Sequence, residues 1–380
     1  MAVVAASSHS DRLPAKPVAP GASRFHIPSL DGLRAISFFI VFAAHAGLDR
    51  VVPGGFGVTV FFFLSGYLIT TLMRMEVKKT GHVNLKNFYL RRVLRILPPF
   101  YIVLVAAIAL AAFGVLRAGT PLQPMAVSSQ LLHFSNYWIA FRGWSGLPVG
   151  TGVYWSLAVE EHFYFVFPAA FLLLTRLRLS GRQMALSFWG LCALVFAWRC
   201  VLVFGLHAAA DRTYLCSDTR VDSIAFGCAL AVWNNPVLDG VGPNRASPSA
   251  SGVWRFVLLP AGIALLLVSF VVRSPSFRET LRYTLQGIGL TPIFIAAVRW
   301  PEWPIFRFLD WRPMRFVGTL SYSLYLVHQV VLALVEQHSA LGGVARSAIA
   351  LAASLGLAWA MYRLVEKPCA RLRMRLSAAE

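Results

Sequence analysis

The chain alternates between long apolar segments and short polar ones over most of its length. A helix needs about 20 apolar residues to cross the hydrocarbon core of a bilayer, and several segments reach this length. With the weaker segments included, the pattern predicts ten spans, although nine or eleven also fit it. The expected spans are residues 33–50, 55–75, 99–117, 153–175, 184–206, 220–234, 254–272, 281–298, 315–337 and 346–365.

Composition supports a membrane protein. Apolar residues make up 57% of the chain and charged residues 13%, whereas soluble domains contain about 25% charged residues. We therefore predict an all-α, polytopic membrane bundle formed by residues 28–368. Residues 1–27, rich in Ala, Pro and Ser, are expected to be a disordered cytoplasmic tail, and residues 369–380 a short basic cytoplasmic tail.

The net charge of +19 is also typical of nucleic-acid-binding proteins. Here, however, the basic residues cluster between apolar segments, as the positive-inside rule describes. The densest basic run, residues 78–95, lies on the cytoplasmic side if the N-terminus does. Ten spans then place both termini in the cytoplasm, and no nucleic-acid partner is expected.

The five cysteines lack metal-type spacing and are interpreted as small buried side chains, so no metal is expected. The longest outer segment, residues 118–152, is rich in aromatic residues, which suits either a membrane-interface belt or a platform for stacking sugars. Residues 234–252, rich in Pro, Gly and Ser, are expected to be a flexible connector.

Two costly polar residues lie on the first span. Arg34 and His45 are eleven residues apart, which is about 16 Å along a helix. Ionisable groups inside a span are functional candidates, and a neutral imidazole accepts a hydroxyl proton near pH 7. The alternative is that His45 is a packing residue.

The fourth span begins with Trp155, expected as an anchor at the outer interface, and carries Glu160 at a depth similar to that of His45. A carboxylate beside an imidazole would orient it as a base. The alternative is a structural ion pair with an arginine such as Arg220. Arg220 and Asp222 are expected as a pair at the outer mouth of the sixth span, either near the acceptor or only fixing a loop.

Two further spans carry polar side chains on one face. Tyr325 and His328 follow Ser321 in the ninth span and are expected to line a cavity or to bond neighbouring helices. Arg92 and Arg95 lie at the inner boundary with Arg34, where arginine suits phosphate geometry; anionic lipid headgroups are the alternative ligand. This layout suits a phosphorylated donor inside and an acceptor outside.

These segments together resemble acyltransferase family 3. The resemblance runs from about residue 28 to residue 368 and rests on motifs in the family's order. They are SLDGLRAISFFIVFAAH (29–45), FFFLSGYLIT (61–70), FYLRRVLRILPP (88–99), YWSLAVEEHFY (154–164), TRVDSIAFG (219–227), LSYSLYLVH (320–328) and EKP (366–368).

The resemblance implies about ten spans and transfer of an acyl group, most often acetyl, from cytoplasmic acyl-CoA to a hydroxyl of a cell-envelope or exported glycan. It implies a bacterial inner-membrane location. By position, His45 and Glu160 would be catalytic, and Arg34, Arg92 and Arg95 would lie near coenzyme A. Many relatives carry a further periplasmic domain. The printed chain ends about 15 residues after its last expected span, so we expect any relay domain to come from a separate partner.

We therefore predict a membrane O-acyltransferase in which His45, oriented by Glu160, deprotonates the acceptor. Possible donors to the tetrahedral oxyanion are Tyr325, His328 and Ser65, the last also placed near the cofactor. The alternative function is a transporter of a glycan or acyl donor without catalysis. It would use the same polar cavity, although the sequence shows no internal repeat.

Overall fold

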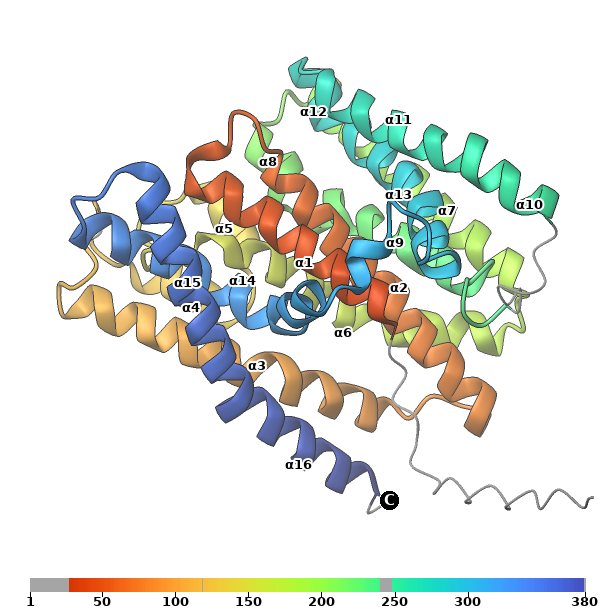
Figure 1. The fold of residues 1–380 in the computed structure, drawn as a ribbon, viewed down its shortest axis with the longest axis horizontal. Helices are drawn as coiled ribbons and strands as arrows, with labels where there is room; N and C mark the ends of the chain where they lie inside the picture. Colours follow the sequence, from red (N-terminus) through yellow and green to blue (C-terminus); the bar gives the residue numbers. More distant parts are fainter. Residues whose placement is uncertain (1–26, 118, 240–247, 379–380) are drawn as a thin grey trace, which may run out of the picture.

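The computed structural model describes residues 27–117, 119–239 and 248–378, and every regular element in these ranges is a helix (Figure 1). The predicted helical bundle is confirmed. Within the described ranges, nine helical segments are long and apolar enough to span a membrane. They are Pro28–Leu48, Gly54–Thr80, Leu85–Ala112, Gly152–Arg176, Gly181–Gly205, Ser251–Val271, Leu281–Arg299, Arg312–His338 and Gly343–Leu376.

Figure 1 labels the helices individually, and some spans consist of more than one labelled helix. The labelled helices of the spans are α1 (Pro28–Ala43), α2 (Gly54–Thr80), α3 (Leu85–Ala112), α6 (Trp155–Arg176), α7 (Gly181–Cys200), α10 (Pro248–Val253), α11 (Leu259–Val271), α13 (Leu281–Arg299), α14 (Arg312–His338), α15 (Gly343–Met361) and α16 (Lys367–Ala378).

The sixth expected span corresponds to α9 (Ser217–Val232), which has 16 residues. A helix of that length rises about 24 Å, less than the hydrocarbon thickness of about 30 Å. Nearly all its residues are buried, and it packs against α2, α7 and α13. It is therefore a central core helix enclosed by longer helices.

Close packing of α2 on α9 depends on two glycines. A Cβ at Gly66 would lie 2.0 Å from the carbonyl oxygen of Ile224, and one at Gly227 would lie 2.1 Å from that of Phe63. Only hydrogen side chains allow the two backbones to approach so closely. Gly227 of α9 thus serves close helix packing.

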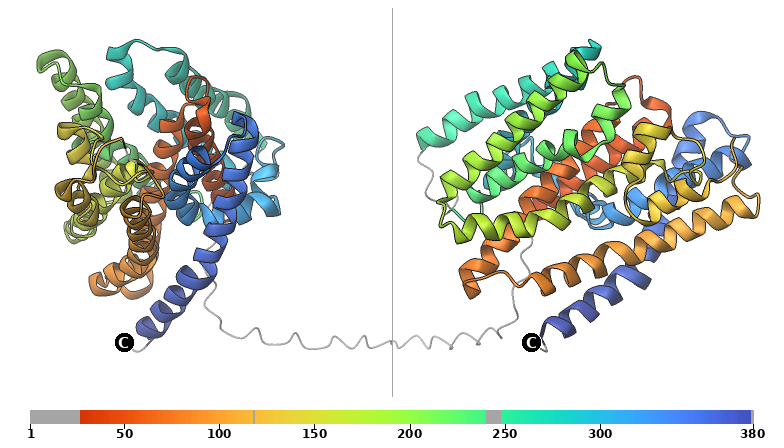
Figure 2. Two further views of the ribbon diagram at one scale, coloured as in Figure 1. Left: turned by 90° about the vertical axis from the view of Figure 1, so that its left-hand side faces the viewer. Right: turned by 180° about the vertical axis from the view of Figure 1, so that it is seen from behind.

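The third span begins at Leu85, well before the expected start at residue 99. Asn84 caps the helix by accepting a hydrogen bond from the backbone N–H of Asn87. The helix then continues through Pro98 and Pro99. Residues 85–95 of the basic run therefore form the first turns of α3, and α3 contacts α16 (Figure 2).

Two expected irregular segments contain helices. Residues 118–152 include α4 (Pro124–Leu131) and α5 (Ser135–Arg142), and the expected C-terminal tail is mostly the helix α16. The expected N-terminal tail, up to residue 26, lies outside the described residues, as do residues 240–247 of the expected connector.

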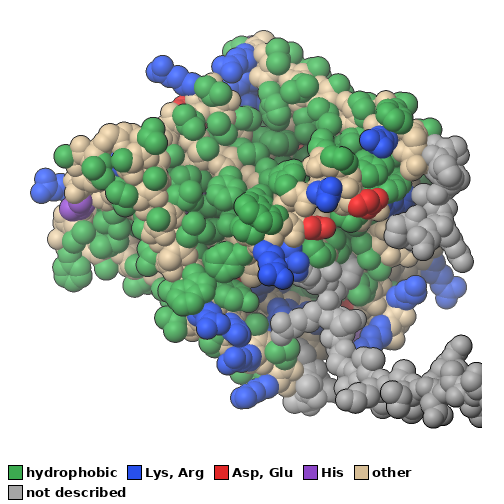
Figure 3. All heavy atoms as spheres, viewed as in Figure 1, with side chains coloured by type: hydrophobic (Ala, Val, Ile, Leu, Met, Phe, Trp, Pro, Cys, Tyr) green, Lys and Arg blue, Asp and Glu red, His purple; other side chains and the backbone are tan. Residues whose placement is uncertain are grey.

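The visible surface in Figure 3 is apolar across its middle, and lysine and arginine side chains gather along the lower edge, over α16. Inside, the buried apolar residues form two clusters, one around α1, α3, α6 and α14 and the other around α2, α9, α11 and α13. An apolar outer surface is what lipid contact requires.

Candidate active site

A first cavity of 260 Å³ opens between α1, α2, α3, α6 and α14. Three arginines line it, Arg34 from α1 and Arg92 and Arg95 from α3. Its other polar lining residues are Asp31, Ser65, Ser156, Glu160, Glu161, Tyr164, Ser321, Tyr322 and Tyr325. The three expected phosphate-binding arginines therefore face one space.

The arginines of this cavity differ in their partners. Arg34 pairs with Asp31 at 2.8 Å. Arg92 lies 4.3 Å above the ring of Tyr164, and neither Arg92 nor Arg95 forms an ion pair with a residue that the structure describes. The neighbouring Arg91 points elsewhere and pairs with Glu76 at 2.8 Å. The three arginines are balanced in formal charge by Asp31, Glu160 and Glu161, but Arg92 and Arg95 keep guanidinium N–H donors that an anionic ligand would engage.

Glu160 does not pair with His45. Its carboxylate accepts hydrogen bonds from Ser65 at 2.7 Å and from Tyr164 at 3.4 Å, all within the first cavity. The expected Glu160–His45 pair is wrong because Glu160 lines the first cavity and His45 lines another. The neighbouring Glu161, which was not among the predicted site residues, lines the first cavity as well.

His45 is oriented by a second histidine. Its Nδ1 lies 3.0 Å from Nε2 of His328, and the two rings stack with centroids 5.2 Å apart. Nδ1 of His328 lies 2.8 Å from the carbonyl oxygen of Tyr325. A carbonyl only accepts, so in the neutral ring Nδ1 of His328 carries the hydrogen and Nε2 accepts from Nδ1 of His45. Nε2 of His45 is then left as a free base.

His45 lies in an unusual backbone segment at the end of the first span. His45 lies in a wider, π-helical turn, Ala44–Leu48, which follows directly after α1. Gly47 within this turn has a φ of 99°. Such turns displace a helix end and occur often at functional sites. The sequence showed the histidine but gave no signal for this turn.

A second cavity, of 520 Å³, receives His45. It lies between the loop that follows α1, the start of α6, the short helices α8 (Ala210–Leu215) and α12 (Pro275–Glu279), and the start of α13. Trp155, Tyr214 and Phe270 supply aromatic walls. Burial raises the pKa of the Tyr214 phenol, so this hydroxyl stays protonated.

The two cavities share two lining residues, Val58 and Tyr325. The hydroxyl of Tyr325 contacts Ser156 Oγ at 2.7 Å and donates to the carbonyl oxygen of Val153 at 3.1 Å. We call Val58 and Tyr325 the partition. The partition separates the cavity lined by Arg34, Arg92 and Arg95 from the cavity lined by His45.

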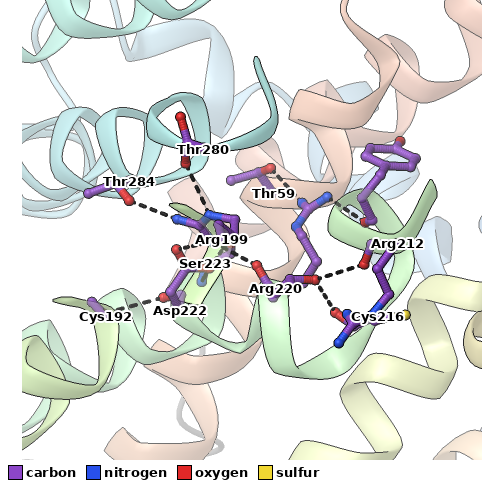
Figure 4. Close-up of polar contacts among 12 residues, drawn as sticks. Thr59, Cys192, Arg199, Arg212, Cys216, Arg220, Asp222, Ser223, Thr280 and Thr284 are labelled. Carbon is purple, nitrogen blue, oxygen red and sulfur yellow. Dashed lines mark hydrogen bonds and ion pairs between the residues drawn. The ribbon is translucent and has the colours of Figure 1, made fainter. Parts of the chain in front are cut away.

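The expected Arg220–Asp222 pair is also wrong. Asp222 pairs instead with Arg199 of α7 at 2.7 Å, and both side chains are fully buried (Figure 4). Arg199 also donates to the carbonyl oxygens of Thr219 and Thr280. The partners are 23 positions apart and lie on different helices, α7 and α9, so no i, i+3 or i, i+4 spacing indicated this pair.

Arg220 is a fully buried cation that forms no ion pair with a described residue. Its guanidinium donates to Thr59 and to the carbonyl oxygen of Tyr214, both at 3.1 Å (Figure 4). It lies 4.1 Å from the ring centroid of Tyr283 and 5.7 Å from that of Trp155. Trp155 is therefore buried beside this cation, and its expected place at the membrane interface is wrong.

Cysteines and candidate metal ligands add no further site. The five cysteines are free, and three of them are buried. Among the residues that the structure describes, no group of three or more His, Cys, Asp or Glu side chains is arranged to hold a metal ion.

Comparisons with known proteins identify the family. Residues 27–363 match a family model described as an acyltransferase domain. The chain is 30% identical to peptidoglycan O-acetyltransferase OatA of Listeria monocytogenes over 91% of this chain and 56% of that protein. It is 30% identical to a putative peptidoglycan O-acetyltransferase of Bacillus subtilis over 90% of this chain and 55% of that protein.

A putative O-acetyltransferase of Staphylococcus aureus is 28% identical, over 90% of this chain and 57% of that protein. The chain therefore spans little more than half the length of these relatives. No solved structure matches it. The family match covers nearly all of the described helical bundle, and the chain belongs to acyltransferase family 3.

Proposed function

We propose that this chain is a multi-pass O-acyltransferase of the bacterial inner membrane. It transfers an acyl group, acetyl in the simplest case, from cytoplasmic acyl-CoA to a hydroxyl of a cell-envelope glycan. The observation that carries the proposal is the pair of cavities that meet at the partition, with Arg34, Arg92 and Arg95 in one and the His45 base in the other. The relatives named as O-acetyltransferases support the same reaction class.

The proposed orientation places the Arg34 end of α1 and both termini in the cytoplasm, following the positive-inside rule. The first cavity then opens to the cytoplasmic donor. Arg34, Arg92 and Arg95 bind the phosphates of acyl-CoA, and the thioester arm extends toward Ser65 and the partition. The second cavity opens to the outer side, where the glycan acceptor binds.

The proposed reaction joins the two cavities at Tyr325. Nε2 of His45 takes the proton of the acceptor hydroxyl, whose oxygen attacks the thioester carbonyl. In this proposal the Tyr325 hydroxyl turns its single hydrogen from the carbonyl oxygen of Val153 to the oxyanion that forms. The carbon–sulfur bond then breaks, the new ester remains with the acceptor, and the coenzyme A thiolate takes a proton from the cytoplasmic side. His328 orients His45 and does not contact the reacting atoms.

The test follows radiolabelled acetyl-CoA with the purified protein in nanodiscs and a peptidoglycan disaccharide as acceptor. We expect label to appear as an ester on the saccharide. His45→Ala is expected to lower kcat by at least about 100-fold, the range that a general base contributes. His338→Ala changes an exposed histidine on α14 and serves as the control.

A second pair of variants tests the donor cavity. Arg92→Ala with Arg95→Ala is expected to raise the donor KM, whereas Arg91→Ala, whose side chain pairs with Glu76 instead of lining the cavity, is expected to leave it unchanged. Binding of acetyl-CoA without consumption of the thioester would contradict the proposal and favour a transporter.

A further inference from the structure

The second cavity is lined by four arginines that the reaction just described does not use. They come from separate segments: Arg50 follows α1, Arg273 follows α11, Arg278 belongs to α12, and Arg282 lies at the start of α13. His45 lines the same cavity. The fold therefore brings four cations to the space in which the proposed base is exposed.

These arginines lack acidic partners. None of the four forms an ion pair with any residue in the described ranges. Arg282 donates to the hydroxyl of Tyr283 at 2.8 Å and lies 4.8 Å from that ring, but its Nε is buried without a hydrogen-bond partner. A buried N–H without an acceptor is costly, and a ligand oxygen would relieve that cost.

Two of the three acidic residues that line the cavity accept hydrogen bonds from neighbouring side chains. Asp211 accepts a hydrogen bond from the indole of Trp144 at 3.1 Å, and Glu279 accepts one from Thr213. Asp49 is the third acid, so four cations face three anions and the lining carries a formal charge of +1. The unpaired donors are thus on the arginines, while two of the three acids already have structural partners.

We propose that the second cavity binds an anionic group of the acceptor saccharide, a carboxylate or a phosphate, through Arg278 and Arg282 with Arg50 and Arg273 beside them. The inference rests on the proposed function and names its acceptor class, an acidic glycan. The aromatic side chains of Trp155, Tyr214 and Phe270 suit the faces of sugar rings. An arginine fork matches two anionic oxygens, so it would fix the position of the sugar relative to His45.

The test measures equilibrium binding without any acyl donor. The probes are the disaccharide N-acetylglucosaminyl-N-acetylmuramic acid and its methyl ester, which differ by one negative charge. The full chain is held in phosphatidylcholine nanodiscs. We expect the acid to bind about tenfold more tightly than the ester, as one charge-assisted contact gives. Equal binding of the two probes by the unmodified protein would overturn the proposal.

Variants assign the effect to the arginines. Arg278→Gln combined with Arg282→Gln is expected to abolish the preference for the acid and to leave ester binding unchanged. Arg282→Lys keeps the charge and should retain part of the preference. Arg142→Gln, at an exposed position on α5 outside the cavity lining, is the control. An equal loss in Arg142→Gln, or loss of ester binding as well, would refute the assignment.

A second arm distinguishes a glycan from a lipid phosphate. Replacing phosphatidylcholine by phosphatidylglycerol should leave binding of the acidic disaccharide unchanged if the cavity takes a glycan. Competition by phosphatidylglycerol would overturn the glycan assignment. Because this assay needs no thioester, acid-selective binding in a protein that does not consume acetyl-CoA would reject the proposed function alone.

Discussion

At the scale of single residues, most of the predicted site residues line a cavity, but several of them interact with other partners than those predicted from the sequence. Arg34, Arg92 and Arg95 line one cavity, as their shared depth suggested. His45 and Glu160 were matched by depth as well, but depth along a span does not fix the direction in which a side chain points. His328, and not Glu160, is the hydrogen-bond partner of His45, because α14 packs directly on α1.

Substitution of His328 tests this orienting role. His328→Leu removes the acceptor for the Nδ1 hydrogen of His45, whereas the amide oxygen of His328→Gln retains one. We expect the leucine variant to lose at least about tenfold more kcat than the glutamine variant, with the donor KM unchanged in both. Steady-state kinetics with acetyl-CoA measures this, and equal kcat values in the two variants would contradict the hydrogen-bond chain.

The buried Arg199–Asp222 pair predicts a large loss of stability. Asp222→Ala leaves a fully buried guanidinium without its anion, and removing one partner of such a pair typically costs about 3–5 kcal/mol. Thermal unfolding of the detergent-solubilised protein measures the loss. Glu336→Gln breaks a solvent-exposed pair with Arg346 and should change stability by less than about 1 kcal/mol. Similar losses in both variants would refute the distinction.

At the scale of helices, hydrophobic segments were located well and their ends poorly. Apolar length predicted most spans, because a bilayer imposes that length on the sequence. The start of α3 was missed because its first turns are polar and basic, and two prolines follow them. The core helix α9 was predicted as a span because small apolar residues suit tight packing as well as lipid.

The α2–α9 contact gives a prediction at this scale. Gly227→Ala places a methyl group against the backbone of Phe63, and such overpacking typically costs about 1–3 kcal/mol. Gly190→Ala on α7 meets nothing within 4 Å and should be neutral or slightly stabilising. Thermal unfolding of both variants checks this, and equal stability would show that α2 and α9 lie farther apart.

At the scale of the whole molecule, the nine candidate spans in the described ranges and the short helix α9 together decide the topology. If α9 traverses the bundle as a tenth helix, both ends of the chain face the same side. We expect reporter proteins fused to the N-terminus and to the C-terminus to be active in the cytoplasm. Periplasmic activity of either fusion would contradict the proposed orientation.

The partition has an electrical consequence. With water in both cavities, which meet at Val58 and Tyr325, the membrane potential would fall mainly across that thin layer. In the proposed reaction the acyl group crosses it uncharged, but His45 releases a proton outside while the thiolate takes one inside. Each turnover thus moves one positive charge outward, which costs about 2.3 kcal/mol per 100 mV of inside-negative potential. Transfer in proteoliposomes should slow as a potassium diffusion potential of that sign is imposed, whereas a voltage-independent rate would place both proton transfers on one side.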